Sequence, residues 1–369
     1  MSTSIGPDST VSADHSVPDS KGKRWHILIS DYPDSMMASH DMEIALLRQA
    51  LEGPEAGETA RPVDVEVYAF QETARVEFTK KLAWADAVLT AFTPINAGLL
   101  LACPRLKIIS LNATGYDNVD LNAATQCGVG VSPVGEYCTH DVAEYTLALL
   151  LALLKNLKHY GDEVSRREIW SYSSVRPNPR LSDLTVAIFG LGRIGRAVAS
   201  KLQSLKPTVI AHDPYVDPAL AAKLGVALVS KEEALARGDV ISNHMKLDTD
   251  TRAYFGADEF AAMARHPYFL NLGRGLSVDE EALATALDEG RVSGAGLDVL
   301  TDETPRLKQH CLNGRDNVII TPHAAFYTTS AVEDLQRISV MNIAYFLRGE
   351  TEKVFRLVNN PDRSIRRER

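Results

Sequence analysis

Three glycines near the middle of the chain have the spacing of a phosphate-binding turn. They form Gly190-Leu-Gly192-Arg-Ile-Gly195, directly after an apolar run and at the start of a helical pattern. The first glycine permits a tight turn, the second lets the backbone approach a pyrophosphate, and the third allows the helix to pack closely on the strand. Arg193 and Ile194 lie in the same turn, where a helix N-terminus would receive the negative charge. The pattern predicts a dinucleotide site, and its alternative is a glycine-rich turn that arose by chance.

An acidic residue supports the dinucleotide interpretation. Asp213 ends the next strand-like run, PTVIAHD, where a carboxylate can accept hydrogen bonds from the adenosine ribose. The same charge repels a 2′-phosphate, and neither Pro214 nor Tyr215 is an arginine that could bind one. The sequence therefore favours NAD over NADP as the cofactor.

These residues need a parallel sheet to position them. From Trp25 onward, short β-branched runs alternate with helical patterns, which is typical of βαβ units. We expect helices at 141–158 and 329–347, with a polar connecting loop at 161–183. The helix at 329–347 could return to pack on the first lobe. The strands expected in a small first lobe are 25–30, 63–70, 87–90 and 107–110. Those expected in a doubly wound second sheet are 184–190, 207–213, 240–243, 268–271, 294–297 and 318–321.

Bulk composition narrows the class of protein. The chain has 369 residues, 45% of them apolar, which suggests about two globular domains. A net charge of −9 provides no broad basic field, so neither nucleic acid nor a membrane is an expected partner. The four cysteines are far apart in sequence, which favours reduced thiols in a cytoplasmic protein and no metal site.

Three later segments carry a family resemblance. They are NLGRGLSVDEEAL at 271–283, GLDVLTDE at 296–303 and TPHAAF at 321–326, and their order and spacing resemble the D-isomer-specific 2-hydroxyacid dehydrogenase family. The resemblance runs from about residue 91 to 347, includes NATGYDNVDLNAA and CTHDVAEYTLALLLAL, and is closest to the branch of C-terminal-binding proteins. It implies an α/β fold of the formate/glycerate dehydrogenase type, with two Rossmann-like lobes. One lobe is a doubly wound parallel sheet for the cofactor, and the other is a smaller flavodoxin-like substrate domain.

The residue patterns and the resemblance together divide the chain into parts, and the resemblance also implies a homodimer formed through the cofactor domain. The expected parts are a flexible tail at 1–24, a first part of the substrate domain at 25–134, an NAD-binding domain at 135–325, a return of the substrate domain at 326–360 and a flexible tail at 361–369.

The catalytic roles implied by the resemblance fall on Arg274, Glu303 and His323. Arg274 would bind and polarise a keto acid, because a planar guanidinium can hold a carboxylate and a carbonyl oxygen together. His323 would be the acid/base, and Glu303 would favour its charged form. Taken singly, a surface salt bridge, a solvated turn and a strand end are the alternatives. Thr304 stands where the family usually has proline, so Pro305 arrives one position late.

Glu303 separates two chemistries within the superfamily. Formate dehydrogenases of this superfamily carry glutamine as the partner of the histidine and transfer no substrate proton. A glutamate at this position therefore indicates a reaction in which a proton accompanies the hydride.

Further contacts follow from the same resemblance. Thr114 and Gly115 would offer backbone N–H groups to the substrate carboxylate, and their alternative is a simple turn before a helix. Phe326 would face the substrate, with a core aromatic as its alternative. The residues expected near the nicotinamide half of the cofactor are Val142, Leu272, Gly273 and Asp298.

Lys246 departs from the family pattern, which has proline at this position. We hypothesise that it contacts a second anionic group on the substrate, as in phosphonopyruvate, although a solvent-facing lysine is the alternative. The expected function is an NAD-dependent, reversible reduction of a small 2-keto acid to the D-2-hydroxy acid. The alternative is an NAD(H)-sensing interaction protein, because the related branch includes corepressors that retain these residues.

Overall fold

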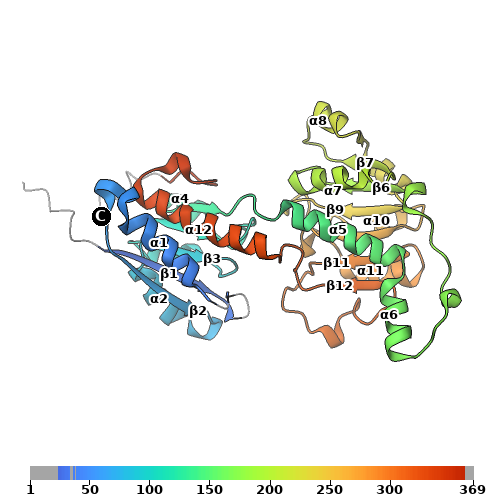
Figure 1. Ribbon diagram of the computed structural model, residues 1–369, viewed down its shortest axis with the longest axis horizontal. Coiled ribbons are helices and arrows are strands. Elements are labelled where there is room, and N and C mark those ends of the chain that lie inside the picture. Colours follow the sequence, from blue (N-terminus) through green and yellow to red (C-terminus); the bar gives the residue numbers. More distant parts are fainter. Residues whose placement is uncertain (1–23, 34–35, 38, 362–369) are drawn as a thin grey trace, which may run out of the picture. The chain divides into compact units, whose positions relative to one another are not determined.

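The computed structural model describes residues 24–33, 36–37 and 39–361, which form two compact units (Figure 1). The first unit contains the described residues up to 135 and those from 333 onward, and the second unit contains residues 136–332. All but one residue of each tail expected at 1–24 and 361–369 lies outside the described residues. Among the described residues, no helix combines the length and the apolar character that a membrane crossing requires.

The first unit is built on a five-stranded parallel sheet. Its strand order is β2-β1-β3-β4-β5, which is the flavodoxin-like order and confirms the predicted fold class. The last strand was not predicted, because its four residues GVSP begin with glycine and end with proline. The strands are β1 (Trp25–Asp31), β2 (Val63–Ala69), β3 (Ala87–Thr90), β4 (Ile108–Leu111) and β5 (Gly130–Pro133).

Helices cover both faces of this sheet. Successive residues of a strand point to opposite faces, so Ile27 packs toward α1 and α12, whereas Leu28 packs toward α2, α3 and α4. The return of α12 is also fixed by a hydrogen bond that Ser110 Oγ donates to the carbonyl of Ser339, at 2.8 Å. The helices are α1 (Asp41–Glu52), α2 (Arg75–Trp84), α3 (Ala97–Ala102), α4 (Leu121–Gln126) and α12 (Thr329–Arg348).

The second unit contains a seven-stranded parallel sheet with the order β12-β11-β10-β9-β6-β7-β8. The chain therefore starts in the middle of the sheet and winds outward in both directions, as in a doubly wound dinucleotide fold. All six predicted strands are present, and the missed strand, β8, has only two residues. The strands are β6 (Thr185–Phe189), β7 (Thr208–His212), β8 (Ala227–Leu228), β9 (Val240–Asn243), β10 (Tyr268–Asn271), β11 (Gly294–Leu297) and β12 (Val318–Ile320).

Two apolar clusters enclose this second sheet. On β6, Val186 and Ile188 face a cluster that includes α5 and α7, and Ala187 and Phe189 face a cluster that includes α9, α10 and α11. The helices of the unit are α5 (Thr139–Leu154), α6 (Leu157–Arg166), α7 (Arg193–Gln203), α8 (Pro218–Lys223), α9 (Lys231–Arg237), α10 (Ala257–Ala262) and α11 (Glu280–Asp288).

The prediction of one helix at 141–158 followed by a loop at 161–183 is wrong. Asn156 has a left-handed backbone, with φ of 51°, and separates α5 from α6. Asparagine adopts this conformation more readily than most residues, so the break has a local cause. The second helix continues to Arg166, and Lys158 Nζ ties it to the sheet by donating to the carbonyls of Arg315 and Val318, at 2.5 and 2.7 Å.

The boundary expected at 325/326 also differs from the structure, in which residues 326–332 belong to the second unit. Ala331 is buried in the same apolar cluster as α5, and Thr328 Oγ1 donates to Asp141 Oδ1 at 2.6 Å. These contacts hold the start of α12 on the second unit. The first boundary lies between residues 135 and 136, one residue after the expected position.

Candidate active site

The glycine turn has the backbone that its sequence requires. Gly190 follows β6 with φ of 87°, and a Cβ there would lie 2.8 Å from the backbone nitrogen of Met245. A Cβ on Gly195 would lie 2.1 Å from the carbonyl oxygen of Gly190, so α7 can approach β6 this closely only with glycine. A Cβ on Gly192, in contrast, would meet no atom within 4 Å. The turn is therefore closed on its protein side and open at Gly192, where α7 begins.

Asp213 stands at the end of β7, beside this turn. Its Oδ2 accepts a hydrogen bond from the backbone of Leu191 at 2.7 Å, and its Oδ1 accepts one from Tyr215 at 2.9 Å. The carboxylate thus joins the glycine turn to the loop after β7, and it is only half-buried. An open turn at a helix N-terminus, with an acid at the next strand end, fits the pyrophosphate and ribose of a dinucleotide. Arg193 and Ile194 form the first turn of α7.

A histidine and a glutamate meet at the carboxyl ends of β11 and β12. His323 Nδ1 lies 3.2 Å from Glu303 Oε2, and the two side chains are 33% and 49% exposed. The residue inserted after the glutamate is Thr304, and it is accommodated within a local turn. Its backbone N–H and its hydroxyl both donate to Asp302 Oδ1, at 2.9 and 3.0 Å. His323 itself has φ of 52°, a conformation that costs energy outside glycine and therefore needs support from its surroundings.

Asp298 supplies that support. It is 2% exposed, and its carboxylate accepts hydrogen bonds from Thr321 Oγ1 and from the backbones of Ala324 and Ala325, at 2.6 to 2.9 Å. Its own carbonyl accepts from the backbone of His323 at 2.7 Å. Burial raises the pKa of this carboxyl, and these hydrogen bonds oppose the rise. Asp298 thus holds the loop that carries the histidine, whereas the expected contact with the nicotinamide stays a prediction.

Arg274 follows β10, between the loops after β9 and β11. Its guanidinium donates to the carbonyl of Gly273 at 3.0 Å, and the side chain is half-buried. Its own carbonyl accepts from Asn271 Nδ2 at 3.1 Å and from Ser277 Oγ at 2.6 Å. A Cβ on Gly275 would lie 1.9 Å from the carbonyl oxygen of Leu300, so the arginine loop packs directly against the backbone that leads to Glu303.

Two buried asparagines beneath this loop were missed at the sequence level. Asn243 and Asn271 end β9 and β10, face each other in register, and are at most 1% exposed. Asn243 Nδ2 donates to Asn271 Oδ1 at 3.0 Å and to Ser277 Oγ at 2.8 Å. The only available signal was a polar residue at the end of each of two apolar strands. These amides position the Arg274 loop.

The remaining predicted residues are spread more widely. Leu272 and Gly273 are buried beside the arginine, and Val142 is buried in the core on α5. Phe326 is partly buried, with its ring centroid 6.1 Å from that of Tyr137 and 6.4 Å from that of His323. It therefore both packs against the core and borders the histidine.

Lys246 lies in the loop after β9 and is 78% exposed. Its Nζ lies 3.1 Å from Asp248 Oδ2, and this contact is the largest cause of the lowered pKa of the aspartate. The position favours the solvent-facing alternative. Thr114 and Gly115 follow β4 in the first unit, where Thr114 Oγ1 donates to the carbonyl of Gly135 at 3.3 Å.

The second unit thus gathers its polar groups at one edge of its sheet. The glycine turn, Asp213, Arg274, Glu303 and His323 all follow the carboxyl ends of strands, where ligands bind in doubly wound sheets. The last three follow β10, β11 and β12, which are neighbours in the sheet. The described residues contain no group of three or more His, Cys, Asp and Glu side chains that could hold a metal ion.

Comparisons with known proteins place this arrangement in a family. Residues 147–325 match the NAD binding domain of D-isomer specific 2-hydroxyacid dehydrogenases. The hydroxypyruvate reductase of Blautia hydrogenotrophica is 32% identical over 286 residues, which cover 75% of this chain and 87% of that protein. The D-3-phosphoglycerate dehydrogenase of Mycobacterium leprae is 36% identical over 287 residues, 78% of this chain and 54% of that protein. The chain therefore spans about half the length of such phosphoglycerate dehydrogenases.

A solved structure agrees in fold over almost the whole chain. The D-lactate dehydrogenase from Aquifex aeolicus, complexed with NAD and lactic acid, aligns with a TM-score of 0.78 and 27% identity, covering 91% of this chain and all of that one. The finer placement near the C-terminal-binding proteins stays a prediction. With its predicted α/β fold confirmed and its family motif, sheet order and relatives in agreement, the chain belongs to the D-isomer-specific 2-hydroxyacid dehydrogenase family and carries the NAD-binding domain of that family.

Proposed function

We propose that this protein is an NAD-dependent dehydrogenase that reversibly reduces a small 2-keto acid to the D-2-hydroxy acid. One observation carries the proposal: a guanidinium and a histidine–glutamate pair follow three adjacent strands of the unit that also holds the glycine turn. When bound, NADH supplies the hydride that reaches C2 of the keto acid. The glycine turn, Asp213 and the start of α7 would hold the cofactor.

His323 would move the proton. Because Nδ1 lies against the Glu303 carboxylate, Nε2 is the ring nitrogen left to donate to the keto oxygen as it gains charge. The glutamate would orient the imidazole ring through its contact with Nδ1. In the reverse direction, the neutral imidazole would accept the proton of the hydroxyl group.

Arg274 would bind the substrate. A guanidinium can donate to a carboxylate oxygen and to the adjacent keto oxygen, which orients C2 and stabilises the negative charge that develops during reduction. The two buried asparagines beneath the loop fix the backbone from which this side chain extends. Thr114 and Gly115 of the first unit are proposed to offer backbone N–H groups to a substrate carboxylate.

The names of the relatives support a proposal for the substrate class. The hydroxypyruvate reductase, the D-3-phosphoglycerate dehydrogenases and a glycerate dehydrogenase are all named for three-carbon 2-hydroxy or 2-keto acids. We therefore expect a three-carbon acid, such as hydroxypyruvate, to be turned over faster than longer or branched keto acids. Phosphonopyruvate, which carries a second anionic group, tests the separate hypothesis on Lys246.

The decisive experiment is a panel of 2-keto acids followed by NADH absorbance. Arg274→Ala should lower kcat/KM by more than about a hundredfold while NADH affinity stays close to wild type, because the arginine holds the keto acid and not the cofactor. Arg48→Ala, an exposed arginine on α1, serves as the matched control. Tight NADH binding with no turnover of any acid would instead support the NAD(H)-sensing alternative.

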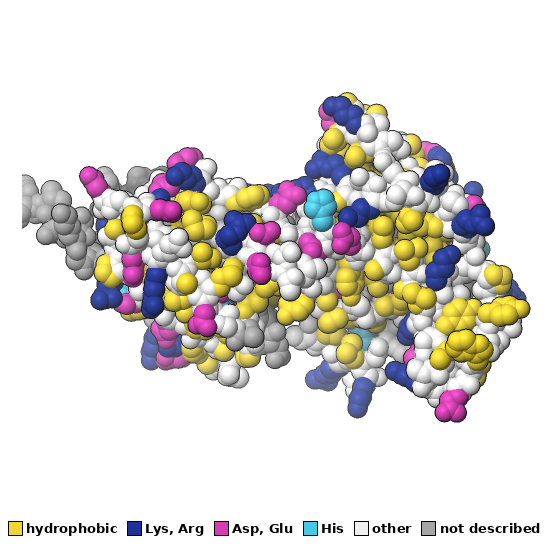
Figure 2. Space-filling view, viewed as in Figure 1, with side chains coloured by type: hydrophobic (Ala, Val, Ile, Leu, Met, Phe, Trp, Pro, Cys, Tyr) yellow, Lys and Arg dark blue, Asp and Glu magenta, His cyan; other side chains and the backbone are white. Residues whose placement is uncertain are grey.

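We also propose that the protein forms a homodimer through its second unit. The α6 patch consists of large apolar side chains that are exposed on α6 and the segment after it: Leu157, Val164, Ile169, Trp170 and Tyr172. Trp170 and Tyr172 are 91% and 90% exposed, and Figure 2 shows hydrophobic side chains gathered over this part of the second unit. Exposed aromatic residues of this size are typical of protein interfaces.

The homodimer is tested by measuring mass with light scattering. Replacing Trp170 and Tyr172 together by lysine should convert the dimer to a monomer, whereas Val76→Lys on α2, also at an exposed apolar residue, should leave the dimer intact. A monomeric wild type, or a dimer that survives the double substitution, would contradict the proposal.

A further inference from the structure

A polar hollow lies in the first unit at the amino ends of the strands, whereas Thr114 and Gly115 follow the carboxyl end of β4. Its volume is about 350 Å³. It is lined by Arg24, Trp25, His26, Arg61, Asp86, Arg105 and Lys107. These residues come from the chain that enters β1, β2, β3 and β4, so the hollow opens at the amino ends of four neighbouring strands.

This location separates the hollow from the proposed substrate contacts. Lys107 immediately precedes β4, whereas Thr114 and Gly115 follow the carboxyl end of the same strand. A four-residue strand is about 13 Å long, so the two ends of β4 cannot serve one small molecule. A ligand in the hollow would be a second ligand.

The charges around the hollow do not balance. Asp86 is 3% exposed and accepts hydrogen bonds from Arg105 at 2.8 Å and Lys107 at 2.9 Å, while Arg24 pairs with Asp64 at 3.0 Å. With Arg61, four cations thus face two carboxylates, which leaves an excess of two positive charges. Burial lowers the pKa of His26, so this histidine adds no charge near neutral pH.

Arg61 and Trp25 are the least satisfied members of the group. The guanidinium of Arg61 lies over the indole of Trp25, 4.6 Å from the ring centroid, and has no ion pair or side-chain hydrogen bond within the described part of the chain. Lys107 Nζ lies 5.1 Å from the same ring. Trp25 is 6% exposed, and its Nε1–H finds no acceptor among the described residues. Such a buried donor is costly unless a ligand or water accepts from it.

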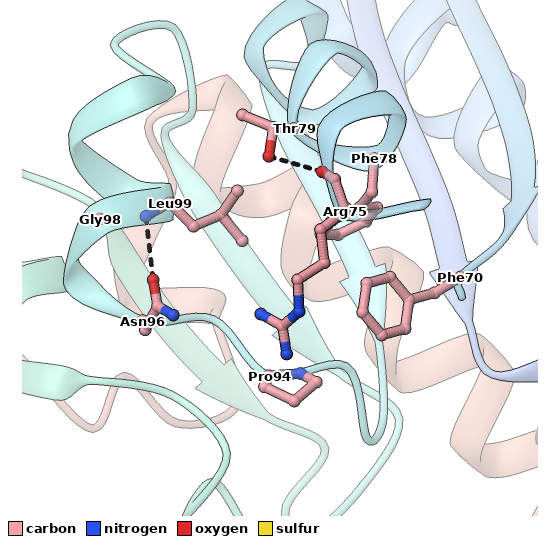
Figure 3. Close-up of a pocket in the computed structure, with 8 residues that line it drawn as sticks. All are labelled: Phe70, Arg75, Phe78, Thr79, Pro94, Asn96, Gly98 and Leu99. Carbon is pink, nitrogen blue, oxygen red and sulfur yellow. Dashed lines mark hydrogen bonds between the residues drawn. The ribbon is translucent and has the colours of Figure 1, made fainter. Parts of the chain in front are cut away.

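A second hollow in this unit provides a useful contrast. It is smaller, about 170 Å³, and lies at the carboxyl edge of the sheet, where Figure 3 shows the guanidinium of Arg75 between Phe70 and Asn96. Its single cation is already paired, because Arg75 contacts Glu72 at 2.5 Å. It therefore offers neither excess charge nor an unpartnered buried donor.

We propose that the hollow at the amino edge is a binding site for a small dianion of the phosphate monoester class. Two excess positive charges match one such group, and arginine guanidiniums match its oxygens in planar pairs of hydrogen bonds. A volume of about 350 Å³ fits a small metabolite. The net charge of −9 argues against an extended polyanion such as nucleic acid, because a chain with net negative charge repels it.

The test follows the three tryptophan indole N–H resonances by NMR during titration at constant ionic strength. Glycerol phosphate should shift the Trp25 resonance in a saturable manner, with Trp25→Phe used for its assignment, and acetate should not. Arg61→Gln should weaken the phosphate ester by about tenfold or more, because a charge-assisted contact is lost. Lys80→Gln, which removes an exposed cation from α2, should leave the affinity unchanged.

Arg274→Ala distinguishes this site from the proposed active site, because binding at the hollow should survive that substitution. Loss of binding in Arg274→Ala, an equal loss in Lys80→Gln, or the absence of saturable shifts in the wild type would overturn the proposal. If Arg61→Gln does not fold, Arg61→Lys retains the charge but not the planar donors. Unchanged affinity in Arg61→Lys would then contradict the role of the guanidinium.

Discussion

Both units use a buried aspartate to hold a loop in place, and they differ in the residues that this loop carries. In each unit, a buried aspartate at the carboxyl end of a strand accepts backbone hydrogen bonds from a nearby loop. Asp31 ends β1 and accepts from Tyr32, Ala91 and Phe92, while Asp298 follows β11 and accepts from Ala324 and Ala325. Burial raises the pKa of both carboxyls.

The difference lies in the residue that each loop carries. The loop held by Asp298 includes His323, in a strained conformation and in contact with Glu303. The loop after β3 that Asp31 holds, residues 91–96, has the sequence AFTPIN and contains no group that could transfer a proton at neutral pH. The same kind of contact thus holds a proposed catalytic residue in one unit only, and substitutions can test this difference.

The largest effect is expected from His323→Gln. General acid–base catalysis contributes roughly a hundredfold to ten-thousandfold to rate, so kcat for keto acid reduction should fall by about that factor. The affinity for NADH, measured by fluorescence titration, should change little. His266→Gln alters an exposed histidine of the same unit whose Nδ1 lies 2.8 Å from the carbonyl oxygen of Gly290, and its turnover should match wild type. Wild-type kcat in His323→Gln would remove the basis for the proposed mechanism.

The paired substitutions Asp298→Asn and Asp31→Asn test the comparison directly. Each places an amide NH2 where a carboxylate oxygen now accepts a backbone N–H, so each should lower the free energy of unfolding by about 1–3 kcal/mol, measured by urea denaturation. Only Asp298→Asn should also lower kcat, by about tenfold to a hundredfold, because only that loop carries the proposed proton donor. Equal losses of kcat in both variants would show that the two loops do not differ in function.

A histidine at the carboxyl end of β9 provides a pH-dependent prediction. His244 follows β9, its Nε2 lies 2.8 Å from Ser242 Oγ, and burial lowers its pKa to about 4. The unfolded chain protonates this histidine near pH 6.5 and the folded chain does not, so the free energy of unfolding should fall as the pH drops from about 6.5 to 4. This loss amounts to at most about 3 kcal/mol.

His244→Gln should reduce that decline, because the glutamine does not titrate, and thermal denaturation between pH 4 and 7 measures it. His266→Gln should retain the wild-type decline. An identical pH dependence in wild type and His244→Gln would mean that the fold does not hold His244 in its neutral form.

Local sequence signals were sufficient to predict the glycine turn and the strands that position the site. The glycine turn is visible because its strand, turn and helix are contiguous, and the alternation of β-branched runs with helical patterns predicted all six of the longer strands in the second sheet. The missed strands β5 and β8 are short or contain glycine and proline, so they lack a periodic pattern. The break at Asn156 depends on one left-handed residue, which hydrophobic periodicity does not detect.

The supporting contacts of the site could not be predicted in the same way. Asn243 and Asn271 are buried because two strands are paired in register, and no local feature distinguishes them from asparagines in turns. The hydrogen bonds of Asp298 likewise depend on the loop after β12 returning to β11. The hollow around Trp25 brings together residues from four separate strand entries, so only the sheet order reveals their shared charge.

The smallest effect is expected from Lys246→Ala. The lysine is highly exposed and pairs with Asp248, so much of its charge is already compensated before any substrate arrives. A surface ion pair of this kind is worth about 0–1 kcal/mol, and a contact with a second anionic group would have to compete with it. We therefore expect kcat/KM for pyruvate to remain unchanged and that for phosphonopyruvate to fall by no more than a few-fold, with Lys80→Ala as the control. A loss larger than about tenfold that is confined to phosphonopyruvate would show instead that Lys246 leaves Asp248 to bind a doubly charged acid, and the substrate class would have to be revised accordingly.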